Sequence, residues 1–226
     1  MIYVNYLEID SVSIEDIAII KKNIPVNFQR RVSGKLISSK KSLLGRALLY
    51  DYLIKAKNKP VNKLVFKLYK SKKLYIENEF SFNISHTKSY VALAITNDEK
   101  ITSIGIDIEK KREISNLNNL LNYFTVREKE AILNNTKKSE EFLKIWTRKE
   151  ALYKAIGKGI YHANSLKIMC LNKTTKCSNK CWHLESFKLN KSHIASCATN
   201  IKSKIVTKEV KNIEIIETLN KRNNIK

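Results

Sequence analysis

The chain has 226 residues, of which 43% are hydrophobic and 28% charged, a composition typical of a globular protein with one large or two small domains. Only five glycines and two prolines occur, which excludes a long flexible linker. The net charge of +22 indicates either a polyanionic partner or a bias toward lysine, because lysine outnumbers arginine by 36 to 7.

Nothing in the sequence directs the protein out of the cytoplasm. It contains no apolar run of roughly 18 residues that could span a membrane, and residues 1–10 lack the basic and apolar regions of a signal peptide. We therefore expect a cytoplasmic protein without disulfides. A zinc site is a less favoured alternative, because its four candidate ligands include no compact Cys-x-x-Cys pair: Cys177, Cys181, His183 and His193.

In the first half of the chain, hydrophobic patterning predicts short helices and strands. Residues 1–10 are predicted to form a strand, and Ser13 is a suitable N-cap for a helix over residues 13–23, before Pro25. A wide apolar face predicts a long helix over residues 42–57. The remaining predicted elements are strands at 64–68, 80–85, 90–96 and 101–109, with a turn at 97–100.

The second half begins with helical patterns and continues with strands. Helices are predicted over residues 124–133 and 140–156, and the second ends at a glycine-rich segment that starts with Gly157. The predicted strands are 165–171, 181–189, 192–199 and 211–217, and residues 220–226 form a basic tail.

An internal repeat links the two halves. Residues 88–97 and 191–200 are identical at five of ten positions, at a fixed offset of 103 residues. Because each half also has helical sequence followed by strands, we expect an α+β fold of two similar halves, residues 1–102 and 103–226. A cleft between the halves is then a natural ligand site.

Two acidic residues lie on one predicted strand. Alternate side chains of a strand share a face, so Asp107 and Glu109 point one way while Ile106 and Ile108 point to the buried side. Two neighbouring carboxylates repel unless a cation lies between them, and oxygen ligands suit Mg²⁺. The alternative is a polar strand end that meets the basic residues 110–112.

A second group of polar residues follows the helical period. Trp146, Glu150 and Lys154 recur every four residues and so share one face of the predicted helix. Glu150 could supply a third carboxylate, and Lys154 could bind a phosphate. The alternative is a Glu–Lys pair on a solvated helix face.

Two further segments could bind phosphate. The strand ending in Ser85 and His86 places a hydroxyl and an imidazole at its end, where they could also transfer protons. No hydrolase triad order or Gly-x-Ser-x-Gly motif accompanies them. A basic run before and within the first long helix could bind phosphates or be solvated surface: Arg30, Arg31, Lys35, Lys40, Lys41 and Arg46.

In this order, the motifs resemble those of the Sfp-type 4′-phosphopantetheinyl transferase superfamily. The family pattern is Asn-x-Ser-His, Gly-x-Asp-x-Glu, and Trp-x-x-Lys-Glu-Ala-x-x-Lys followed by Gly-x-Gly. These correspond to residues 83–86, 105–109, 146–154 and 157–159. Residues 123–130 resemble the family's Phe-x-x-x-Glu element and residues 42–46 its N-terminal helix, so the likeness covers about residues 25–200.

The resemblance implies a fold of two pseudo-symmetric α/β halves with the active site in the cleft between them. It also implies an enzyme of the holo-acyl-carrier-protein synthase type. Such an enzyme transfers 4′-phosphopantetheine from coenzyme A to a serine of a carrier protein, releases 3′,5′-ADP and requires Mg²⁺. The carrier could belong to fatty-acid, polyketide or nonribosomal-peptide synthesis.

The resemblance also implies roles for individual residues. Asp107, Glu109 and Glu150 would bind Mg²⁺, and Lys154 the pyrophosphate. The other coenzyme A contacts would be Ser85, His86 at the 3′-phosphate, and Arg30, Lys41 and Lys73 toward the nucleotide. We expect Glu150 also to remove the proton of the attacking serine, and the role of Glu128 stays open.

Two departures from the family pattern concern the coenzyme A side. Lys72-Lys73-Leu74 replaces the usual Gly-Lys-Pro, and Thr87 replaces the second serine of Ser-His-Ser while keeping a hydroxyl. As partner we expect an acidic carrier protein that the positive surface steers, with a monomeric enzyme and no binding to nucleic acid or membrane. The rival hypothesis, a basic nucleic-acid-binding module, rests on the charge and lacks a recognisable binding motif.

Overall fold

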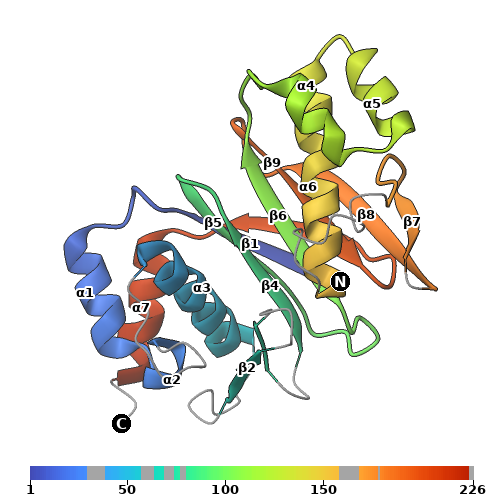
Figure 1. Ribbon diagram of the computed structural model, residues 1–226. Coiled ribbons are helices and arrows are strands. Elements are labelled where there is room, and N and C mark those ends of the chain that lie inside the picture. Colours follow the sequence, from blue (N-terminus) through green and yellow to red (C-terminus); the bar gives the residue numbers. More distant parts are fainter. Residues whose placement is uncertain are drawn as a thin grey trace.

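The computed structural model describes residues 1–29, 39–56, 64–68, 74–76, 80–157, 168–177 and 179–223. Two of the predicted coenzyme A contacts, Arg30 and Lys73, therefore lie outside the described residues. Of the Lys72-Lys73-Leu74 segment, only Leu74 is described. The described chain is a mixed α+β structure, as predicted, with its helices grouped around two four-stranded sheets (Figure 1).

The first sheet contains strands from both ends of the chain. Its order is β10 (Ile205–Glu209), β1 (Ile2–Glu8), β5 (Tyr90–Thr96) and β4 (Ser81–His86). Strand β1 runs parallel to β10 and antiparallel to β5, while β4 and β5 form an antiparallel hairpin. The C-terminal segment thus completes the sheet in which the chain begins.

Helices and a small hairpin cover one face of this sheet. They are α1 (Ile14–Asn23), α2 (Val26–Gln29), α3 (Lys40–Ala56), α7 (Asn212–Asn223), β2 (Phe66–Leu68) and β3 (Leu74–Ile76). A capping box between Ser13 and Asp16 starts α1, as the sequence predicts. Apolar side chains of these helices form one core with β5 residues such as Leu93. Figure 1 shows α1, α3 and α7 side by side in this layer.

The second sheet has the order β6 (Ile104–Lys110), β9 (His193–Thr199), β8 (Lys180–Lys188) and β7 (Thr174–Cys177). All its pairs are antiparallel. Its helical cover consists of α4 (Leu117–Leu120), the 3₁₀ turn η2 (Leu121–Tyr123), α5 (Val126–Leu133) and α6 (Lys138–Ile156). Helix α6 ends as predicted at Gly157, whose positive φ of 76° is readily adopted by glycine.

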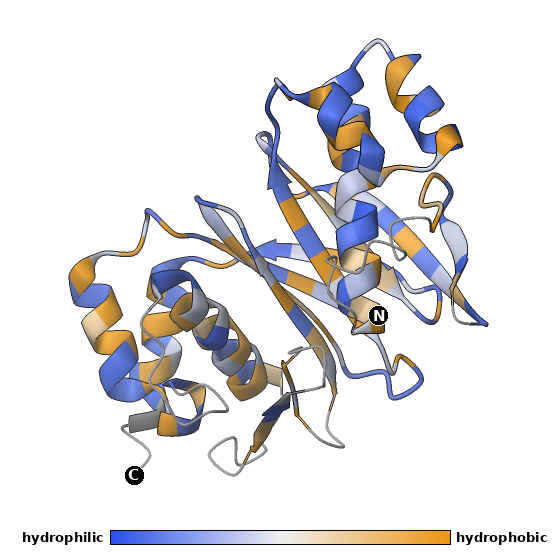
Figure 2. Cartoon of the chain, viewed as in Figure 1, coloured by the Kyte–Doolittle hydropathy of each residue, from blue (hydrophilic) through white to orange (hydrophobic). Residues whose placement is uncertain are grey.

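The faces of the two sheets that carry no helices pack against each other. Val4, Ala92 and Ala94 of the first sheet share a buried cluster with Ile106 and Ile108 of the second. Hydrophobic and hydrophilic residues alternate along strands such as β6 (Figure 2), because alternate side chains face this cluster. The layers are therefore helices, sheet, sheet and helices.

The internal repeat falls on equivalent strands. Residues 88–97 contain β5, which lies between β1 and β4, and residues 191–200 contain β9, which lies between β6 and β8. In each half the first strand is antiparallel to this middle strand. The two halves thus share a strand order, while β10 and α7, from the predicted second half, join the first.

Two strand predictions near the C-terminus are wrong. Residues 211–217 lie mostly in α7, and the described part of 165–171 contains no strand. The error at α7 arises because its isoleucines alternate locally, yet Ile213 is 55% exposed while Ile215 and Leu219, four residues apart, are buried. The predicted tail at 220–226 is likewise helical up to Asn223. No helix among the described residues is long and apolar enough to span a membrane.

Candidate active site

Gly105 allows α6 to lie directly on β6. A Cβ atom added at this glycine would overlap the backbone of Ala151 and Ala155, so any larger residue would push the helix away from the strand. This close approach brings Glu150 and Lys154 of α6 to the part of β6 that follows Gly105. The Gly-x-Asp-x-Glu and Trp-x-x-Lys-Glu motifs therefore meet by backbone contact.

Three side chains from three elements meet around Asp107. The Lys154 ammonium of α6 donates to Asp107 Oδ1 at 2.7 Å and to Ser85 Oγ at 3.0 Å. Ser85, from β4, in turn donates to the same Asp107 oxygen at 3.0 Å. The other oxygen, Asp107 Oδ2, is buried and accepts no hydrogen bond of good geometry from the described residues. The arrangement therefore leaves one buried carboxylate oxygen unsatisfied.

Burial and the neighbouring polar groups shift the pKa of Asp107 in opposite directions. Burial raises the pKa of this carboxyl, while the charge of Lys154, the hydroxyl of Ser85 and the backbone amide of Ile108 act to lower the pKa. The net effect is a raised pKa of Asp107. A positive charge at Oδ2 would offset the part of the desolvation cost that these neighbours do not.

Two of the predicted acidic residues act on the third, Glu150. The pKa of Glu150 is raised to about 7, first by burial and then by the negative charges of Asp107 and Glu109, against the opposing effect of Lys154. Glu109 is paired with Arg112 at 2.7 Å. Glu150 thus lies within electrostatic reach of both β6 carboxylates. Among the described residues, however, no three His, Cys, Asp or Glu side chains are gathered closely enough to hold a metal ion.

His86 lies at the end of β4 with an exposed side chain. Its pKa is lowered, mainly by partial desolvation and also by the positive charges of Lys41 and Lys154, while Asp107 opposes this shift. The charge of Lys41, at the start of α3, therefore reaches His86. Of the predicted coenzyme A contacts, the structure joins Ser85 and Lys154 by a hydrogen bond, and the charges of Lys41 and Lys154 both act on His86.

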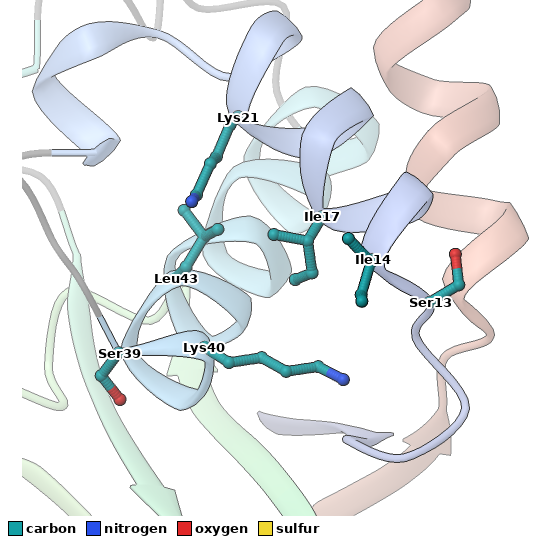
Figure 3. A pocket seen from close by; sticks show the side chains of 7 residues that line it. All are labelled: Ser13, Ile14, Ile17, Lys21, Ser39, Lys40 and Leu43. Atoms are coloured by element: carbon teal, nitrogen blue, oxygen red, sulfur yellow. The ribbon is translucent and has the colours of Figure 1, made fainter.

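Part of the predicted basic run is not available to a ligand on the surface. Arg46 is buried, with its guanidinium 3.9 Å from the centre of the Phe66 ring, and burial lowers its pKa to about 10. Lys40 donates to the carbonyl oxygen of Val12. Figure 3 shows Lys40 in a pocket of about 180 Å³ between α1 and α3, which none of the site carboxylates lines.

The structure gives Glu128 a role inside the fold. Its carboxylate is completely buried, pairs with Lys149 at 2.8 Å and accepts from the backbone amides of Thr125 and Cys170. Lys149 also donates to the carbonyl oxygen of Ile168. The pair joins α5, α6 and the segment at 168–170, so Lys149, inside the Trp-x-x-Lys-Glu motif, faces the core while Glu150 faces the site.

Sequence reasoning also missed Asn83. The sequence motif assigns no role to this residue, but its Oδ1 accepts from the backbone amide of Ile106 in β6 at 2.9 Å.

The zinc alternative finds no support among the described residues, because His193 is buried against Tyr90 and bonded to Thr87 and Ser192.

Comparison with known proteins identifies the fold that carries these motifs. The model of the 4′-phosphopantetheinyl transferase superfamily matches residues 103–199, which run from β6 through α6 to β9. Residues 103–199 of the chain are thus similar to this superfamily. The match contains Asp107, Glu109, Glu150 and Lys154, and thus most of the site described above.

Three curated transferases of the superfamily are similar to the chain. They are the 4′-phosphopantetheinyl transferases gsp of Aneurinibacillus migulanus, psf-1 of Bacillus pumilus and HetI of Nostoc sp., with 35%, 28% and 34% identity. The alignments cover 54%, 62% and 42% of this chain. They cover 50%, 61% and 40% of the relatives, so the chain spans about half the length of the curated relatives it matches.

Proposed function

We propose that the protein transfers 4′-phosphopantetheine from coenzyme A to a serine of an apo carrier protein and releases 3′,5′-ADP. The observation that carries this proposal is the meeting of Ser85, Asp107 and Lys154, from three motifs far apart in sequence: Ser85 and Lys154 bond Asp107 Oδ1, while the buried Oδ2 has no hydrogen-bond partner among the described residues. The similarity to three named phosphopantetheinyl transferases supports the same reaction.

The acidic residues of the site fit Mg²⁺. Asp107, Glu109 and Glu150 supply oxygen ligands only, which this ion prefers, and Asp107 Oδ2 is buried without a hydrogen-bond partner among the described residues. To hold the ion, these three side chains would have to move closer together than they lie in the described chain, and the ion would compete with Arg112 for Glu109. When bound, Mg²⁺ supplies positive charge that offsets the negative charge of the pyrophosphate.

Basic residues of the site would bind and orient coenzyme A. Lys154 would contact the pyrophosphate and offset the charge that develops on the leaving 3′,5′-ADP. Ser85 would help to hold the coenzyme, and His86 and Lys41 would bind its 3′-phosphate together; the influence of the Lys41 charge on His86 supports this. Arg30 and Lys73 remain proposed contacts at the nucleotide end.

We propose Glu150 as the base of the reaction. The carrier serine would attack the β-phosphorus, its proton would pass to Glu150, and the bond from the β-phosphorus to the bridging oxygen would break. A carboxylate with a pKa of about 7 suits this role, because it combines an ionised fraction at neutral pH with substantial basicity. This pKa applies without metal; the same carboxylate would also contact Mg²⁺, whose positive charge would lower its pKa and so reduce its basicity.

We propose that the partner is an acidic carrier protein. We also propose that the enzyme is a monomer in the cytoplasm. The net charge of +22 supports an anionic partner through electrostatic steering. Nucleic acid is the rival partner, and tight binding to DNA or RNA at physiological salt would favour it.

The direct test is incubation of the protein with coenzyme A, Mg²⁺ and a panel of apo carrier proteins. Mass spectrometry should show a gain of one phosphopantetheine on at least one carrier and none on a carrier whose acceptor serine is replaced by alanine. Asp107→Asn should abolish the gain. A panel without any modified carrier, with coenzyme A binding absent as well, would contradict the proposal.

A further inference from the structure

Polar side chains join the two sheets where their edges meet. Strand β4 is the edge of the first sheet and β6 the edge of the second, and within the described chain the two strands share no backbone ladder. Instead, side chains at alternate positions along β4 and the residue after it reach the second half. Asn83 accepts from the Ile106 amide, Ser85 donates to Asp107, and Thr87 lies 3.4 Å from His193 Nε2.

These contacts act on consecutive parts of β6. The bond from the Ile106 amide to Asn83 Oδ1, at 2.9 Å, holds the backbone directly before Asp107. Ser85, two residues further along β4, holds Asp107 Oδ1 at 3.0 Å. Because β4 and β6 share no ladder, Asn83 supplies a backbone-to-strand bond that a neighbouring strand would otherwise provide.

We propose that Asn83 is a positioning residue for the cation site at Asp107, which it serves without contacting the cation. With the backbone of Ile106 held by Asn83 and Oδ1 held by Ser85 and Lys154, the remaining oxygen Oδ2 is kept in one buried position. Loss of the Asn83 bond would let β6 move against β4 and would misplace Oδ2. This inference rests on the proposed function.

The test measures cation binding directly rather than catalysis. Mn²⁺ serves as the probe, and its free concentration is followed by electron paramagnetic resonance, with and without coenzyme A. Residues that orient metal ligands typically contribute a factor of about 10 to metal affinity, so Asn83→Ala should weaken Mn²⁺ binding by about tenfold. Thermal unfolding of each variant shows whether the fold persists.

Two matched variants separate positioning from general stability. Asn83→Asp keeps an acceptor for the Ile106 amide and should restore Mn²⁺ binding relative to Asn83→Ala. Ser81→Ala lies at the preceding alternate position of β4, where no side-chain bond to β6 is found among the described residues, and should bind Mn²⁺ like the wild type. If Asn83→Ala does not fold, Asn83→Thr takes its place, because threonine favours strands and its hydroxyl is one bond too short.

Distinct results would overturn the two ideas. If Asn83→Ala is less stable but binds Mn²⁺ like the wild type, or if Asn83→Asp fails to restore binding, Asn83 is only a structural tie. If the wild type binds no Mn²⁺ under either condition, or Asp107→Asn binds as well as the wild type, the proposed cation site is wrong and this inference falls with it.

Discussion

At the scale of single residues, neighbours decide what each side chain of the site can do. Glu150 and Lys149 are adjacent in sequence, yet one faces the site and the other is buried against Glu128. Asp107 is held through one oxygen, while its other oxygen has no hydrogen-bond partner in the described part of the chain. The chemistry of the site therefore depends on the direction of each side chain as much as on its type.

The raised pKa of Glu150 makes stability depend on pH. The carboxyl ionises near 4.5 in the unfolded chain and near 7 in the folded protein, so its charge destabilises the fold increasingly between these pH values and constantly above them. Without metal, Glu150→Gln should raise the free energy of unfolding by about 1–3 kcal/mol at pH 8 and by much less at pH 5. Urea denaturation measures both, and an equal gain at the two pH values would contradict the assignment. Glu140→Gln, on the exposed first turn of α6, is the control.

Removal of Lys154 should affect both the reaction and its neighbour. Lys154→Ala removes the positive charge proposed for the pyrophosphate and leaves Asp107 without its ion-pair partner. Transfer to a carrier should slow by about 100-fold, the usual cost of losing one electrostatic contact in a transition state. Lys144→Ala, which removes a lysine paired with Glu141 elsewhere on α6, should leave the rate unchanged. A normal rate for Lys154→Ala would refute the role of this ammonium.

At the scale of elements, close packing sets the distance between α6 and β6. Gly105 allows this contact because an added Cβ would meet the backbone of α6, which cannot rotate aside. Gly45 of α3 differs, because an added Cβ would meet only side-chain atoms, the nearest being Ile84 Cγ2 at 2.8 Å. The two glycines thus form a matched pair for substitution.

Gly105→Ala should destabilise the protein by about 3 kcal/mol or more, since overpacking against backbone forces the elements apart. It should also displace Glu150 and Lys154 from Asp107 and lower transfer. Gly45→Ala should destabilise less than Gly105→Ala, because alanine favours the helix by about 1 kcal/mol and the overlap is with side-chain atoms of Ile84 and not with backbone. Chemical denaturation and transfer assays on both variants test the contrast, and equal effects would contradict it.

The buried pair Glu128–Lys149 should couple α5 to α6. Lys149→Met leaves an unpaired buried carboxylate and should cost about 3–5 kcal/mol of unfolding free energy. Adding Glu128→Gln removes that charge and keeps an acceptor for one of the two amides, that of Thr125 or that of Cys170, so the double variant should be more stable than Lys149→Met alone. A double-mutant cycle by urea denaturation measures the coupling, and additive costs would show that the pair acts independently.

At the scale of the whole molecule, two sheets packed face to face join the halves, and the site lies where their edges meet. The C-terminal elements β10 and α7 return to the first sheet, and Thr218 of α7 donates to the buried Asp51 of α3 at 2.7 Å. The chain therefore crosses between the halves twice. Because β1 and β10 lie in the same sheet as β4, both ends of the sequence help to fix the position of β4 relative to β6.

The net charge of +22 should affect how the transfer rate depends on salt concentration. If the positive surface steers an acidic carrier, the apparent second-order rate constant for the carrier should fall more steeply with salt than that for coenzyme A. Transfer assays across a salt series at fixed Mg²⁺ measure both slopes. Equal slopes would indicate that the lysine content reflects composition alone.

Local patterns determined much of this protein. Periodicity and capping signals predicted α1, α3, α5 and α6 and the main strands of both sheets, and the ordered motifs predicted the superfamily, because such signals are encoded within a few residues of each other. The repeated segments at residues 88–97 and 191–200 likewise predicted two similar halves.

Only the tertiary structure decided the features that depend on contacts between distant residues. It placed α7 where alternating isoleucines predict a strand, buried Arg46 of the basic run, and paired Lys149 with Glu128. It also raised the pKa of Glu150 and gave Asn83 a partner in β6. The physical reason is that burial, desolvation and hydrogen bonding between sheets arise from packing across the whole chain, which no local pattern contains.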